Sequence, residues 1–151
     1  MSFNPGSYSN ASVIWGYNDR TLTQMKLYKA EDSTEYSTTS TTPVDGVSIT
    51  ITAPSDRGLS LRIFAKADIK TVATGGTAYV NLVIDQKSYS QSTQSTSYVR
   101  KYFGLDSPLF FILGPGESIT VKIQYYTDNE SYAAYISNQS ILVESRELII
   151  G

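Results

Sequence analysis

Three basic residues of one predicted strand are the charged groups best placed to bind a partner together. Arg62, Lys66 and Lys70 recur at every fourth position of segment 59–70. Because side chains of a β-strand alternate between its two faces, all three project from the same face. Such a stripe could contact an anion, an acidic partner or nucleic acid. Asp68 lies on the same face and interrupts the positive charge, so we do not expect nucleic acid to be a partner.

Tyrosines gather around a predicted loop at residues 127–131. Tyr126, Tyr132 and Tyr135 flank this loop, and their rings could stack on the ring of a sugar. The same side chains also suit a subunit interface or a core, because tyrosine adds apolar area together with one hydrogen-bonding group. A bound glycan is therefore one alternative for this cluster, and packing is the other.

The residue types that most enzymes need are missing from the chain. It contains no cysteine and no histidine, which excludes thiolate chemistry, Ser-His-Asp catalysis and the commonest zinc ligands. No spacing suggests a Ser-Lys pair or two facing carboxylates. The acidic loop Asp128-Asn129-Glu130 lacks the dense carboxylate spacing of calcium loops. We expect no enzymatic activity, no metal and no cofactor.

Length and charge indicate one domain with an amino-terminal arm. The chain has 151 residues, with 12 Lys plus Arg against 14 Asp plus Glu, so no global charge draws it to nucleic acid or an anionic membrane. Residues 1–10 are predicted to be a flexible arm, and residues 11–151 a single domain. The start of the chain shows no export signal, and no apolar run is long enough for a membrane span.

Alternation of apolar and polar residues predicts an all-β fold. No sustained helical periodicity is present, and turn residues separate the alternating segments. A short helix is the alternative at 21–30, and 98–105 is open between a strand and a helical turn. We expect 31–44 to be an exposed loop or an outer edge strand, 88–97 a long loop, and 144–147 the place of a β-bulge. The expected strands are 11–17, 21–30, 47–53, 59–70, 79–84, 98–105, 109–113, 119–125, 132–137 and 141–150.

The segment 107–127 is predicted to be a buried β-hairpin. Pro115 and Gly116 suit the two central positions of a type II turn. Residues 109–113 are apolar throughout, as in strands covered on both faces, and the second cover could be a neighbouring subunit. The residues predicted to form a subunit interface are Phe64, Leu109, Phe110, Phe111, Ile112 and Tyr126.

One turn carries a family resemblance. The segment from Leu113 to Val121, L-G-P-G-E-S-I-T-V, resembles the L-x-x-G-D/E-x-φ-x-V hairpin of jelly-roll domains of the C1q and tumour necrosis factor type. It is also similar to single jelly-roll proteins of virus particles. The resemblance implies an antiparallel two-sheet jelly-roll sandwich of about 8–10 strands that assembles with copies of itself.

Two functional hypotheses follow. The first is a non-enzymatic structural subunit of a virus particle, a capsid, turret or spike jelly roll. It would reside in the virion after assembly in the host cytoplasm, and its partners would be copies of itself and other virion proteins. The alternative is a trimeric C1q/TNF-like head that binds a receptor or a carbohydrate.

Overall fold

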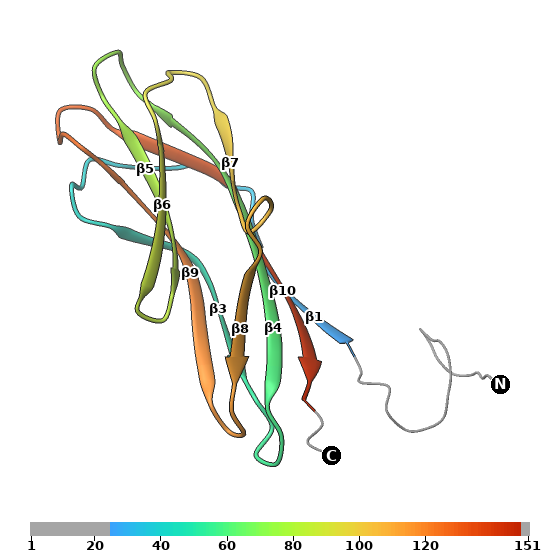
Figure 1. Ribbon diagram of the computed structural model, residues 1–151. Helices are drawn as coiled ribbons and strands as arrows, with labels where there is room; N and C mark the ends of the chain where they lie inside the picture. Colours follow the sequence, from blue (N-terminus) through green and yellow to red (C-terminus); the bar gives the residue numbers. More distant parts are fainter. Residues whose placement is uncertain (1–24, 149–151) are drawn as a thin grey trace.

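The computed structural model describes residues 25–148 of the chain, which form ten β-strands and no helix. The strands make two antiparallel sheets that pack as a sandwich, and the body is long and narrow (Figure 1). The strands are β1 (Met25–Asp32), β2 (Tyr36–Thr38), β3 (Val44–Thr52), β4 (Leu59–Thr71), β5 (Ala78–Ile84), β6 (Lys87–Thr93), β7 (Val99–Phe103), β8 (Leu109–Leu113), β9 (Ser118–Thr127) and β10 (Ala134–Glu147).

The order of the strands is that of a jelly roll. One sheet has the order β1-β10-β4-β7, with β2 following β1 along β10 and β8 following β7 along β4. The other sheet has the order β3-β9-β5-β6. When β1 with β2 and β7 with β8 are taken as two interrupted strands, each sheet has four positions. The eight strands then alternate between the sheets, except that β5 and β6 form a hairpin within the four-stranded sheet. This is the order of a double-sheet jelly roll, and the predicted fold class is confirmed.

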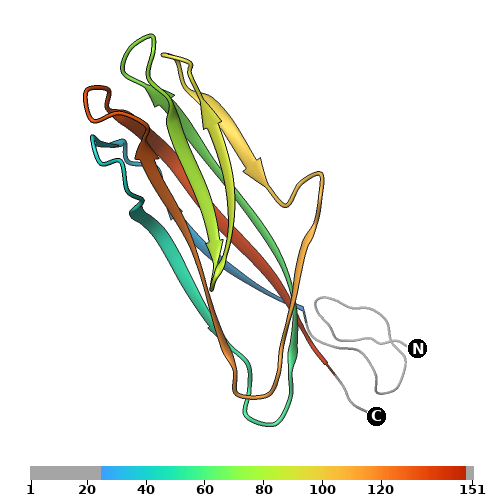
Figure 2. The ribbon, with the colours of Figure 1, turned by 60° about the vertical axis from the view of Figure 1, so that its left-hand side comes forward.

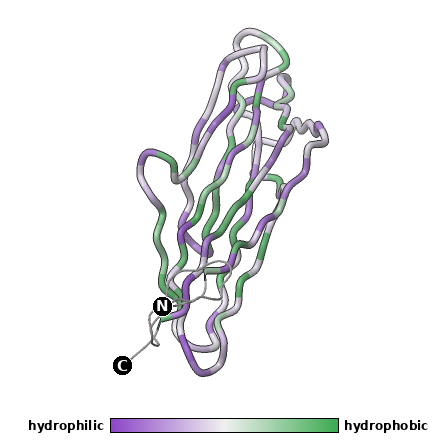
Figure 3. The backbone as a smooth tube through the Cα atoms, turned by 90° about the vertical axis from the view of Figure 1, so that its right-hand side faces the viewer, coloured by the Kyte–Doolittle hydropathy of each residue, from purple (hydrophilic) through white to green (hydrophobic). Residues whose placement is uncertain are grey.

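The core lies between the two sheets and is made by alternate residues. Every second side chain of β4 is buried, and so is every second side chain of β9, because one face of each strand packs against the opposite sheet. Leu61, Ile63 and Ile123 are completely buried. In Figure 3 the hydrophobic colouring lies mainly along the strands, whereas the loop at the bottom of the view is hydrophilic.

The turn at 114–117 is confirmed, but the hairpin predicted around it is wrong. Gly116 has a φ of 76°, and the Glu117 amide donates to the Gly114 carbonyl at 3.1 Å, as in a type II turn. However, β8 pairs with β4, whereas β9 pairs with β3 and β5. The connection therefore crosses from one sheet to the other at the lower end of the sandwich (Figure 2). Turn residues specify a chain reversal, not the partner of each strand.

The long loop predicted at 88–97 is largely a strand. Residues 87–93 form β6, which pairs with β5 across a two-residue turn in which Asp85 has a φ of 52°. β6 is an edge strand with no buried side chain, so its sequence lacks the apolar alternation that identifies a half-buried strand.

The two strands predicted at 132–137 and 141–150 are one strand, β10. The pairing of β10 with β4 shifts between Ser137 and Ser140, and Asn138 has a φ of 52°. The bulge therefore lies at 138–139, and its predicted place near 144–147 is wrong. At 144–147 the pairing with β4 continues without a shift.

The amino-terminal predictions are tested only in part. The arm at 1–10 and the strand at 11–17 lie outside the described residues. β1 confirms a strand within 21–30, but Met25 and Leu27 are exposed, while Tyr28 packs against the core. Segment 31–44 contains the end of β1 and the short strand β2, both of which lie at the edge of the sheet.

Candidate functional site

Most of the exposed large apolar side chains lie on one surface, the outer face of the six-stranded sheet. Phe110 and Ile112 are 63% and 66% exposed, whereas Leu113 is only 5% exposed. The pairing registers place the members of this face in transverse rows across β1, β10, β4 and β7 or β8. The outer face is defined here by Met25, Leu27, Lys29, Glu31, Ser140, Leu142, Glu144, Arg146, Ser60, Arg62, Phe64, Lys66, Tyr102, Phe110 and Ile112.

Arg62 lies near the centre of the outer face and is held by aromatic rings. Its guanidinium carbon is 4.8 Å from the ring centre of Phe64 and 5.8 Å from that of Phe110. At these distances both rings stabilise the positive charge through cation–π interactions. Its Nε is buried and has no hydrogen-bond acceptor. Glu144 is its direct partner in the pairing of β4 with β10, but within residues 25–148 neither side chain forms an ion pair.

The predicted basic stripe shares one face, but it does not form an open cationic patch. Lys70 lies over the rings of Tyr98 and Tyr135, at 4.7 and 5.1 Å from their centres. Asp68, between Lys66 and Lys70, accepts two hydrogen bonds from one guanidinium, that of Arg100, at 2.7 and 3.0 Å.

The Asp68 carboxylate is the most strongly held acid of this face. The Arg100 guanidinium, with a further hydrogen bond from the Asn138 side chain at 2.8 Å, lowers the pKa of Asp68 below its ordinary value of 3.8. The same pair raises the pKa of Arg100. Nearby, burial and a hydrogen bond to Glu35 raise the pKa of Tyr98 to about 12. Asp68 and Arg100 therefore neutralise each other, whereas Arg62, Lys66 and Lys70 form no ion pair within residues 25–148.

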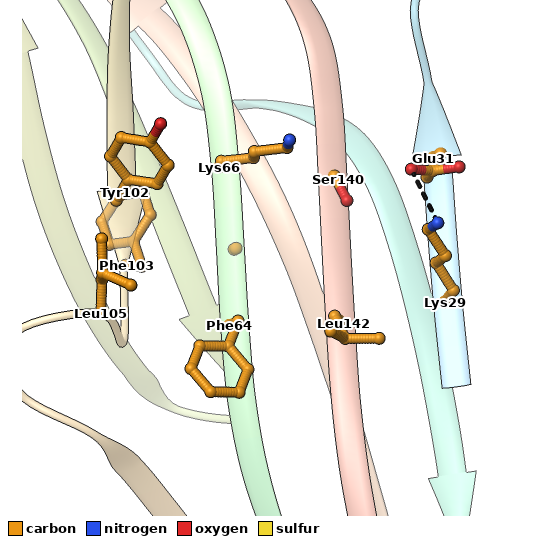
Figure 4. A pocket seen from close by; sticks show the side chains of 10 residues that line it. Lys29, Glu31, Phe64, Lys66, Tyr102, Phe103, Leu105, Ser140 and Leu142 are labelled. Atoms are coloured by element: carbon orange, nitrogen blue, oxygen red, sulfur yellow. Dashed lines mark ion pairs between the residues drawn. The ribbon is translucent and has the colours of Figure 1, made fainter. Parts of the chain in front are cut away.

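A shallow groove runs across the outer face between β7, β4, β10 and β1. It has a volume of about 280 Å³, and its floor is formed by Phe64, Lys66 and Leu142. Figure 4 shows these side chains between Tyr102 and Leu105 on one side and the Lys29–Glu31 ion pair on the other. The groove therefore has apolar side chains and the charged Lys66 in its floor, and the edge at Lys29 and Glu31 is charged.

The tyrosines predicted to bind a glycan do not converge on one site. Tyr126 lies on the outer side of the four-stranded sheet, where its ring stacks on that of Tyr79 at 4.7 Å. Tyr135 lies under Lys70 on the other sheet. Tyr132 belongs to the loop after β9 and contacts the turn at Gly76. These three rings therefore offer no common platform for a sugar.

The acidic loop at 128–130 is used for local hydrogen bonds. Asp128 accepts a hydrogen bond from the Thr77 amide at 2.8 Å, and Asn129 accepts one from the Ser131 amide at 2.8 Å. Among the described residues there is no group of three or more acidic side chains placed to hold a metal ion. In residues 25–148 no helix is long and apolar enough to cross a membrane.

The outer side of the four-stranded sheet is chemically different. Thr50 and Thr120 share a hydrogen bond at 3.0 Å, and Thr52 and Ser118 share one at 2.7 Å. These hydroxyl pairs run along β3 and β9, and β6 adds further serines. Among residues 25–148, the exposed apolar groups are therefore concentrated on the outer face of the six-stranded sheet rather than on that of the four-stranded sheet.

The structure brings together half of the predicted interface residues. Phe64, Phe110 and Ile112 lie on the outer face, whereas Leu109 and Phe111 point inward and pack against the core. Tyr126 lies on the opposite sheet. The prediction did not include Met25, Leu27, Leu142 and Tyr102.

Comparison of the chain with known proteins finds matches among solved structures alone. No family model matches the chain, and no curated protein matches it. Among solved structures it is similar to that of the Gx strain of infectious bursal disease virus, with 12% identity and a TM-score of 0.47, over 80% of this chain and 32% of that one. It is also similar to the decameric BFDV capsid protein, with 10% identity and a TM-score of 0.30, over 82% of this chain and 100% of that one.

An enzyme is among the similar structures as well. A family two carbohydrate esterase from Cellvibrio japonicus matches with 14% identity and a TM-score of 0.32, over 85% of this chain and 36% of that one. This chain spans about a third of the length of the bursal disease virus chain and of the esterase. The assignment of a jelly-roll sandwich rests on the strand order of this chain.

Proposed function

We propose that this protein is a non-enzymatic structural subunit that works by self-association, as a jelly-roll building block of a virus particle. The observation that carries the proposal is the apolar outer face of the six-stranded sheet. Apolar side chains gathered on one broad surface mark an interaction site in most soluble proteins. The double-sheet jelly roll is itself an architecture used by viral capsid domains, although lectins and cupins share it.

The energetics favour weak contacts that are repeated. Complete burial of a large apolar side chain contributes roughly 1.5–3 kcal/mol. Leu27, Phe110 and Ile112 are each more than half exposed, so an interface would gain about half or more of that value from each. Together the three side chains contribute about 2–5 kcal/mol per copy, which at best matches the cost of association, roughly 4–15 kcal/mol. A subunit of a shell is suited to this balance, because many weak contacts act together in a closed assembly.

The test is the size of the assemblies that the purified full-length chain forms. Light scattering and electron microscopy at high protein concentration should show large closed particles or sheets. The double variant Phe110→Ser with Ile112→Ser should abolish them, because it removes the two most exposed large apolar side chains of the described residues. Val83→Ser is the matched control, because Val83 lies on the outer side of the other sheet, and this variant should assemble like the wild type.

Two results would overturn the proposal. A protein that stays monomeric at high concentration has no self-associating face. A discrete trimer that binds glycans and never grows further would favour the receptor-binding or carbohydrate-binding head instead.

A further inference from the structure

The outer face is ordered in four transverse rows across β1, β10 and β4, and three of the rows continue onto β7 or β8. Each row joins residues that are direct partners in the pairing of neighbouring strands, so its members stand side by side on the same face. The rows are Met25, Arg146, Ser60, Ile112; then Leu27, Glu144, Arg62, Phe110; then Lys29, Leu142, Phe64; and then Glu31, Ser140, Lys66, Tyr102.

The rows have a symmetry that suits a twofold axis. In the second row, apolar residues stand at both ends, and the acid and the base stand in the middle. A twofold axis that runs along the strands, midway between β4 and β10, would place β4 of one copy over β10 of the other. Rotation about this axis keeps each row at its own level and reverses its order. Every row therefore meets its own reversed copy.

This operation matches the chemistry of the rows. It places Arg62 over Glu144 of the second copy, and Phe110 over the second copy's Leu27. In the neighbouring rows it places Phe64 over Leu142, and Ile112 over Met25. Apolar side chains thus meet apolar side chains, and in none of the four rows do like charges meet. A twofold axis across the strands at the second row would instead place Arg62 over Arg62, which is repulsive.

Arg62 and Glu144 lack partners of their own in the described part of the chain. They stand side by side, yet no ion pair joins them to each other or to another residue between 25 and 148. The Nε of Arg62 is buried without an acceptor, which is costly unless a further group supplies one. A carboxylate presented from above the sheet would supply it.

We propose that two copies of the chain pack through their outer faces about a twofold axis parallel to the strands, with Arg62 of each copy bound to Glu144 of the other. This proposal rests on the proposed function, because it names the contact through which the subunits associate. The contact is isologous, so the pair of charges occurs twice in it.

The size of the contact indicates its strength. Four strand positions about 4.8 Å apart, and four rows about 6.6 Å apart, cover roughly 500 Å² of sheet per copy. Stable complexes bury about 800 Å² per partner. Facing sheets also cross at about 30°, so the match is best near the centre, at the row of Arg62 and Glu144. We therefore expect a reversible dimer, formed at high micromolar concentration and strengthened in larger assemblies.

Charge reversal tests the pairing directly, with full-length protein in sedimentation equilibrium. Arg62→Glu places two acids opposite each other, and Glu144→Arg places two bases opposite each other. Each single variant should raise the dimer dissociation constant at least about a hundredfold. The double variant in one chain should dimerise again within about tenfold of the wild type. Lys122→Glu, on the other sheet, is the matched control and should change nothing.

Mixing the two single variants separates contact between copies from contact within one chain. A mixture of Arg62→Glu with Glu144→Arg places an acid over a base at both sites, so a heterodimer should form although neither variant dimerises alone. Circular dichroism and thermal melting establish that each variant is folded. If the wild type associates but the mixture shows no heterodimer, the Arg62–Glu144 contact is wrong and self-association stands. If the wild type never associates, the proposed function itself is overturned.

Discussion

Gln139 joins the two sheets at a place where both are irregular, and a single methyl group should break this link. The side chain is 2% exposed, and its Oε1 accepts a hydrogen bond from the Val47 amide at 3.0 Å. Gln139 lies in the bulge of β10, and Val47 lies where the pairing of β3 with β9 shifts between Asp45 and Ser48. The two irregularities therefore face each other across the core, and the hydrogen bond between the Gln139 side chain and the Val47 amide connects them.

Gly46→Ala is the perturbation that tests this link. A Cβ at Gly46 would lie 2.0 Å from Oε1 of Gln139 and 3.1 Å from the carbonyl oxygen of Ile123. The amide side chain has to move, which leaves the Val47 amide without its acceptor at a cost of about 1–3 kcal/mol. Overpacking adds about 1–3 kcal/mol. We expect the free energy of unfolding to fall by about 2–6 kcal/mol.

The assay is urea denaturation followed by circular dichroism, at a protein concentration where the chain is monomeric. Gln139→Ala should also destabilise the fold, because it too removes the acceptor. In the double variant the new methyl group enters space that the amide has left. The destabilisation of the double variant should therefore be at least about 1 kcal/mol smaller than the sum of the destabilisations of the two single variants. Ser48→Ala, an exposed change on the same strand, should stay within about 0.5 kcal/mol of the wild type. Additive costs in the double variant would refute the link.

Four further outcomes are expected. Asp68→Asn should flatten the pH dependence of stability below about pH 4. The pKa of Asp68 is lowered from its ordinary value of 3.8, so its carboxylate stabilises the fold above that pH, and this stabilisation is lost as the pH falls through the folded-state pKa. Acid unfolding curves that match those of the wild type would contradict this prediction. Phe111→Ser should lower the melting temperature of the monomer, whereas Ile112→Ser should weaken association only, because just the first packs against the core. Gly116→Ala should cost about 1–2 kcal/mol in urea denaturation because of its left-handed φ of 76°. Val72→Ser, at the end of the sandwich, should allow dimers in sedimentation velocity but stop larger particles.

The strands that can be predicted from the sequence are those with one face in the core. β4 and β9 alternate strictly because solvent covers one side and the opposite sheet covers the other. β6 could not be found in this way. It is an edge strand with no buried residue, so its pairing depends on backbone hydrogen bonds to β5, which leave no pattern in the side chains.

Pairing between strands and the orientation of apolar runs need long-range information. The turn at Pro115 and Gly116 was predictable from local chemistry, but the sheets to which β8 and β9 belong depend on contacts with β4 and β5. Likewise, the run 109–113 is apolar at every position, so the sequence alone does not distinguish the inward residues from the outward ones. Phe64 was identifiable as a candidate because it is an aromatic residue on an otherwise polar face.

A shell needs more than the contact centred on Arg62. An isologous contact closes after two copies and leaves nothing to extend, so a second surface has to join one dimer to the next. The described residues offer one at the end of the sandwich where β2, the turn after β4 and the segment before β7 meet. Tyr36, Val72 and Tyr98 are 40%, 48% and 36% exposed there, and hydrogen bonds from Val72 to Ala133 and from Tyr98 to Glu35 hold this end together. Because it lies beyond the four rows of the outer face, both contacts can form at once, and loss of the second should leave free dimers.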